Sequence, residues 1–136
     1  MTLRGLLKAV SYELFEFEDA PESSLRIHKL DRQIRLTLDD NIVLFISWSS
    51  DPTQYCIGVS DQSFFSDEPF SMMEMSHSPL WSPLAGTLCD LSFIDPDHQV
   101  LKISSANGAV YIMSYESGVW YADTLSIAGE AIERKS

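Results

Sequence analysis

The segment Gln33–Trp48, which reads QIRLTLDDNIVLFISW, constrains the fold more than any other part of the sequence. Its first half alternates apolar and polar residues, the period of a β-strand with one buried and one solvated face. Asp39, Asp40 and Asn41 follow, and side chains of these two types bond to their own backbone in turns. Ile42–Ile46 is then apolar on both faces, which is typical of a strand covered on both sides. The segment therefore predicts an antiparallel hairpin at the centre of the protein.

Other strand signals recur along the 136 residues, a length that suits one domain spanning 1–136. Asn107-Gly108 marks a second hairpin, because Asn-Gly is the strongest short hairpin signal. Ser24–Leu30 predicts a strand with Ile27 inward and His28 facing solvent or an edge. The last residues, 128–136, are expected to form a tail or a frayed helical turn.

Leu3–Phe17 fits two structures, since its leucines have helical spacing while its second half is rich in aromatic strand formers. An internal repeat favours the strand. Leu3–Tyr12 aligns without gaps with Leu84–Phe93, which contains no good helix, and residues 43–48 parallel residues 110–115. The two repeats would span 3–60 and 84–127, with 61–83 as the connection. We predict a mainly β fold: an antiparallel sandwich or strongly bent sheet of about eight strands, with an α+β fold and an N-terminal helix as the alternative.

The charge distribution bears on partners. The net charge is −11, and no Lys or Arg occurs between Arg35 and Lys102. Ten acidic residues fall in that interval: Asp39, Asp40, Asp51, Asp61, Asp67, Glu68, Glu74, Asp90, Asp95 and Asp97. Such a segment repels phosphate backbones, so direct nucleic-acid binding is disfavoured, and it attracts a basic protein partner. The competing interpretation is that the protein is acidic for solubility alone.

Hydrophobic runs and cysteines indicate the compartment. The longest uninterrupted apolar run is five residues, Ile42–Ile46, against roughly 20 needed to span a bilayer. The start, MTLRGLLKAV, lacks the long apolar stretch of a signal peptide. We therefore expect a cytoplasmic protein with no membrane partner. In that compartment, Cys56 and Cys89 are expected to be reduced, buried thiols rather than a disulfide.

Motifs for catalysis or cofactor binding do not occur, since GxSxG, GxxxxGK[ST] and GxGxxG are all missing. Asp95–His98 could hold a cation through its carboxylates, but Asp-Pro-Asp is common turn chemistry, and the turn is the favoured interpretation. Glu13, Glu16 and Glu18 are expected on a solvated edge. We predict no enzymatic activity, no catalytic residue, no cofactor and no metal site.

The connection Asp61–Pro83 is the best candidate for an interaction surface, because it combines aromatic and methionine residues with flanking acids. It is too apolar for a disordered linker and is expected to be ordered. The competing interpretation is that these side chains cap the core, and we expect this for Phe64, Phe65 and Trp81.

Several short patterns carry a family resemblance. They are Ile46-Ser47-Trp48 at the end of the first hairpin, Trp-x-x-Leu-x-Gly at Trp81–Gly86, the second hairpin strand Ala109–Tyr115, and Trp-x-x-Asp-x-x-x-Ile at Trp120–Ile127. With these patterns the chain resembles small bacterial immunity proteins encoded beside polymorphic or contact-dependent growth inhibition toxins. The resemblance implies a cytoplasmic antitoxin that binds the C-terminal domain of one cognate toxin. It transfers no binding residues.

The predicted function is therefore an immunity protein that neutralises a toxin domain by occluding a basic active-site cleft. The predicted partner-binding residues are Asp61, Asp67, Glu68, Glu74, Asp39 and Asp40. The alternative is a β domain without catalytic activity that binds a small ligand or serves as a subunit of a complex. A deep apolar pocket with converging polar groups would favour that alternative. The oligomeric state is left open by the sequence.

Overall fold

The computed structural model describes residues 2–22, 24, 27–49, 56–65, 69–113, 115–116, 119–120 and 125–131. Over these ranges the chain forms β-strands and one 3-10 turn. These ranges contain no helix that is long and apolar enough to span a membrane. The elements are β1 (Thr2–Phe15), β2 (Ile27–Leu30), β3 (Gln33–Leu38), η1 (Asp39–Asn41), β4 (Val43–Ser49), β5 (Cys56–Ser60), β6 (Phe70–Glu74), β7 (Leu88–Phe93), β8 (Val100–Ser105), β9 (Gly108–Met113), β10 (Tyr115–Glu116), β11 (Val119–Trp120) and β12 (Leu125–Ala131).

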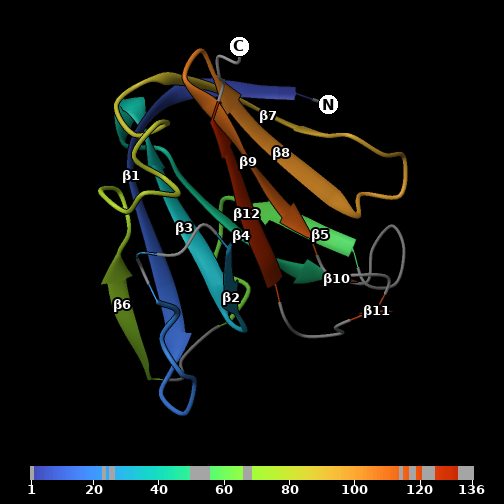
Figure 1. Cartoon of the computed structure of the whole chain (residues 1–136). Helices are drawn as coiled ribbons and strands as arrows, with labels where there is room; N and C mark the ends of the chain where they lie inside the picture. Colours follow the sequence, from blue (N-terminus) through green and yellow to red (C-terminus); the bar gives the residue numbers. More distant parts are fainter. Residues whose placement is uncertain are drawn as a thin grey trace.

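Ten of these strands form one curled sheet (Figure 1), in the order β2-β12-β9-β8-β7-β1-β3-β4-β5, with β6 paired to β1 beside this path. All pairings are antiparallel, and β10 and β11 form a separate ribbon. The curl brings β5 to the turn before β8, where the backbone N–H of Ile57 donates to the carbonyl of His98 at 2.7 Å. The mainly β, strongly bent sheet is confirmed, and the alternative with an N-terminal helix is wrong.

The hub of the sheet is β1, because three strands pair with it. Thr2–Leu6 pairs with β7 and Ser11–Phe15 pairs with β6 on the same edge, while the opposite edge pairs with β3. The β1–β3 register shifts between Leu7 and Ala9, so that Leu7 and Val10 are both buried although they lie three residues apart. This bulge gives a strand the residue spacing of a helical face, which explains why the sequence also fitted a helix.

Residues 75–87 join β6 to β7 and fill the gap between these strands along β1. The backbone N–H of Leu7 donates to Thr87 at 2.9 Å, and the Leu7 carbonyl accepts from Gly86 at 2.7 Å. The Val10 carbonyl accepts from the backbone N–H of Met75 at 2.8 Å. This connection therefore satisfies polar groups of β1 that no strand reaches. It also contributes fully buried side chains to the core: Met75, Leu80, Trp81 and Leu84.

Both predicted hairpins are present. The strands β3 and β4 pair from Ile34 with Ile46 to Thr37 with Val43, and η1 closes the turn with Asn41 at φ 62°, a left-handed conformation that Asn tolerates. The strands β8 and β9 pair in the same way across the turn before Gly108. The internal repeat stays a prediction.

Three sequence expectations are wrong in detail. In β2, His28 is buried and Ile27 is 54% exposed, the reverse of the expectation. The pairing of β2 with β12 sets the strand so that the side chain of His28 faces the core and that of Ile27 faces solvent. Residues 128–131 are part of β12, between β9 and β2, rather than a tail. The connection 61–83 contains a strand, β6, that the sequence did not predict. Trp81 is buried as expected, whereas Phe64 and Phe65 are half-buried.

Candidate partner-binding surface

The predicted acidic residues are distributed over the half of the sheet that contains β3 to β6. Asp39 is exposed in η1, whose backbone also includes Asp40, and Asp61 is exposed directly after β5. Glu74 is exposed at the end of β6. The side chain of Asp40 lies outside the described residues, as do Asp67 and Glu68 altogether.

Strand register shows how far apart these acids are. Successive pairings join Glu74 to Ser11, Ser11 to Arg35, Arg35 to Phe45 and Phe45 to Ser60, the residue before Asp61. Four strand spacings separate the ends of this row, or about 19 Å along the sheet. The structure therefore does not gather Glu74 and Asp61 into one acidic cluster. The Glu74 carboxylate also accepts hydrogen bonds from the backbone N–H of Ser76 at 2.9 Å and from its hydroxyl.

A buried ion cluster lies on the same half of the sheet. Arg32 Nη1 donates to Glu13 Oε1 at 2.6 Å, Gln33 Nε2 donates to the same oxygen at 2.8 Å, and Arg35 Nη1 lies 3.3 Å from Oε2. The side chains of Arg32 and Glu13 are 1% and 3% exposed. We refer to these four residues as the Glu13 cluster. The expectation that Glu13 lies on a solvated edge is wrong, because the strand register places it opposite Gln33.

The Glu13 cluster fastens the segment that follows β5. Gln33 Nε2 also donates to Ser63 Oγ at 2.8 Å, and the side-chain oxygen Oε1 of Gln33 accepts from the backbone N–H of Phe64 at 3.0 Å. The guanidinium of Arg32 lies 5.2 Å from the centre of the Phe65 ring and 4.2 Å from that of Phe70. These contacts hold the start of the 61–83 connection against the sheet. Since Glu13 is closed off by its donors and by aromatic rings, it acts as a structural charge rather than an accessible acid or base.

A second buried polar network joins β1, β2 and the 75–87 connection. Trp81 Nε1 donates to the Tyr12 hydroxyl at 2.8 Å, and that hydroxyl lies 2.6 Å from His28 Nδ1. Burial raises the pKa of Tyr12 well above its ordinary value, although the hydrogen bond from Trp81 acts in the opposite direction. The protonated hydroxyl can therefore donate to Nδ1 while it accepts from Trp81. The network ties three segments of the core together.

The turn Asp95–His98 is built by its own hydrogen bonds. The Asp95 carboxylate accepts from the backbone N–H groups of Gln99 at 3.0 Å and Val100 at 2.9 Å, which is the predicted turn chemistry. His98 has φ 60°, and its ring stacks on Phe93 with centroids 3.9 Å apart. Among the residues that the structure describes, no group of three or more His, Cys, Asp or Glu side chains could hold a metal ion.

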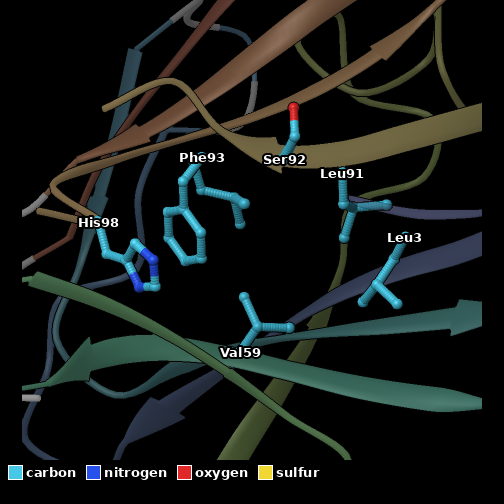
Figure 2. Close-up of a pocket in the computed structure, with 7 residues that line it drawn as sticks. Leu3, Val59, Leu91, Ser92, Phe93 and His98 are labelled. Atoms are coloured by element: carbon cyan, nitrogen blue, oxygen red, sulfur yellow. The ribbon is translucent and has the colours of Figure 1, made fainter. Parts of the chain in front are cut away.

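The stacked pair borders a small apolar cavity of about 90 Å³ between β1, β5, β7 and β8 (Figure 2). Its lining residues are Leu3, Val59, Leu91, Ser92, Phe93, His98 and Leu101. Figure 2 shows Val59 pointing toward this space, whereas the hydroxyl of Ser92 points away from it. The lining is therefore mostly apolar, with the imidazole of His98 as the polar side chain beside the space.

Filling this cavity is expected to stabilise the protein. Val59→Ile adds one methylene group where space exists, and we expect the free energy of unfolding to rise by about 0.5–1 kcal/mol in urea denaturation. Val43→Ile is the matched control, because Val43 lies on β4 and does not line the cavity. An equal gain from both variants would show that the effect comes from strand propensity rather than from the cavity.

The two cysteines are free and buried, as the sequence predicted. Burial raises the pKa of the Cys89 thiol, the hydrogen bond with Thr87 acts against this shift, and the charge of Asp90 adds to it. A buried thiol with a raised pKa is a poor nucleophile. Cys89 is therefore part of the core.

Comparisons with known proteins found no match. No protein-family model matches the chain, and no curated protein or solved structure is significantly similar to it. The candidate surface consequently rests on the fold itself: an antiparallel, curled sheet whose one half carries exposed acids and a connection fastened by the Glu13 cluster.

Proposed function

We propose that this protein is a cytoplasmic immunity protein that binds the C-terminal domain of a cognate bacterial toxin and occludes its basic active-site cleft, without catalytic activity of its own. The observation that carries the proposal concerns the arginines and carboxylates of the described residues, among which Lys8 and Lys29 are exposed as well. All three arginines that the structure describes, Arg4, Arg32 and Arg35, pair with carboxylates. Arg32 is also buried, so it offers no positive charge to a partner.

Exposed carboxylates, in contrast, occur on several turns and strand ends. They are Glu16, Asp19, Glu22, Asp39, Asp61, Glu74 and Asp97. A surface of this kind attracts a basic protein and raises the rate of encounter. Many toxins of this class act on nucleic acids and carry basic clefts, so an acidic, compact protein can bind such a cleft and block it. The resemblance of Ile46–Trp48 and Trp81–Gly86 to immunity proteins supports the same proposal.

The test is co-expression with the C-terminal domain of the protein encoded immediately upstream. We expect this chain to restore growth, to co-purify with the inactivated toxin domain, and to associate with it more slowly as salt increases. Asp61→Lys, Asp67→Lys and Glu68→Lys together are expected to slow association about tenfold at low salt, because they replace attraction by repulsion. Failure to protect cells, or a rate of association that salt leaves unchanged, would contradict the proposal.

A further inference from the structure

An aromatic patch lies where the end of β1 meets the start of β6. The strands pair Phe15 with Phe70 and Glu13 with Met72, and Phe17 follows directly after β1. Phe17 is 81% exposed, Phe70 40% and Met72 53%. We define the aromatic patch as Phe15, Phe17, Pro69, Phe70 and Met72. Phe15, Phe17 and Pro69, together with Glu16, also line an open groove of about 410 Å³.

The patch is held in place before any partner arrives. The rings of Phe15 and Phe17 stack with centroids 5.1 Å apart and planes 8° apart, and Phe15 meets Phe65 edge to face. The carboxylate of Glu18 accepts from the backbone N–H groups of Phe15 and Asp31, which fixes the turn that carries Phe17. Ordered aromatic side chains lose little conformational entropy on binding, so they make efficient anchors.

The surroundings of the patch are acidic. Glu16, Asp19 and Glu22 are exposed on the segment that carries Phe17. The cation that lies against Phe15 and Phe70 is Arg32, which is buried and paired with Glu13. An apolar anchor with an acidic rim fits a partner surface that has an apolar recess edged by Lys and Arg.

We infer that the aromatic patch is the anchor by which this chain holds its basic protein partner, with Phe17 and Met72 as the main contact residues. The inference rests on the proposed function and locates its binding site where the end of β1 pairs with the start of β6, beside Phe65 of the segment that follows Asp61. A second copy of this chain is a poor occupant, because each copy carries a net charge of −11 and would bring an acidic rim against another.

Apolar contacts in the patch should set the dissociation rate and the acidic rim the association rate, and binding kinetics measure both. With the inactivated toxin domain encoded upstream as the probe, Phe17→Ala and Met72→Ala are each expected to weaken binding about 30-fold through faster dissociation. Glu16→Lys together with Asp19→Lys is expected to slow association and leave dissociation nearly unchanged. Ile94→Ala is the control, since Ile94 is 56% exposed on the segment after β7, and it is expected to change affinity by less than about twofold.

The outcomes distinguish the inference from the function on which it rests. If the wild-type chain binds the toxin domain and both alanine variants bind equally well, the patch is not the anchor, although the proposed function stands. If the wild-type chain neither binds nor protects, the proposed function fails and the inference fails with it. If light scattering finds a dimer that Phe17→Ala dissociates, the patch serves self-association and the inference is wrong.

Discussion

Glu13→Gln is expected to lower the free energy of unfolding by about 3–5 kcal/mol, because it leaves the buried guanidinium of Arg32 without a counter-charge. Glu13 accepts from both Arg32 and Gln33, and Arg35 approaches its second oxygen. An amide at this position can offer one oxygen but adds a donor where donors already converge. Urea denaturation with an unchanged m-value would measure the loss.

Two further variants show whether charge is the cause. Glu13→Leu combined with Arg32→Met removes the pair as a unit and is expected to recover most of the lost stability, since apolar replacements of a buried pair are often neutral. Asp90→Asn breaks the exposed pair with Arg4, whose side chain is 66% exposed, and should leave the urea midpoint nearly unchanged. If Glu13→Gln unfolds at the wild-type midpoint, the Glu13 cluster does not stabilise the sheet.

Trp81→Ala is the second substitution with a large expected effect, a loss of about 3–5 kcal/mol. Trp81 is fully buried in the connection between β6 and β7, and its removal leaves a cavity in the core. The same change takes the N–H donor away from the Tyr12 hydroxyl. Thermal denaturation followed by circular dichroism would record the change as a lower midpoint.

Trp81→Phe and Tyr12→Phe divide this loss between packing and hydrogen bonding. Each removes the Trp81–Tyr12 hydrogen bond while it keeps most of the apolar volume, so each is expected to cost about 1–3 kcal/mol. In a double-mutant cycle, the double mutant should lose less stability than the sum of the two single-mutant losses, because both substitutions remove the same hydrogen bond. Full additivity would mean that the bond between Trp81 and Tyr12 contributes nothing.

The hairpins could be predicted because their signals are local. Alternation in Gln33–Leu38, turn residues at Asp39–Asn41 and Asn107-Gly108 need no knowledge of distant segments, and the structure has both turns. The strand β1 was harder, since its bulge imitates helical spacing. The strand β6 was missed because its residues do not alternate in burial: it lies at an edge, and four of its five residues are exposed.

The polar sites depended on long-range register and could not be predicted. His28 became a buried residue only through the pairing of β2 with β12, nearly a hundred residues away in sequence. Glu13 became a buried charge because the β1–β3 register sets it beside Gln33. One local signal of exposure was present at Phe17, which Glu16, Glu18 and Asp19 surround in the acidic segment EFEDAPE.

The pairing of β2 with β12 also has a consequence for how the protein folds during its synthesis. Ile27–Leu30 pairs with residues 125–128, and residues 2–6 of β1 pair with residues 88–92, whereas residues 7–13 of β1 pair with the nearby β3. Such distant pairings slow folding, and these two can form only late in translation. Under the proposed function, a toxin domain that meets a chain in which these strands have not yet paired meets an incomplete fold. Protection would therefore depend on a standing pool of completed molecules rather than on new synthesis.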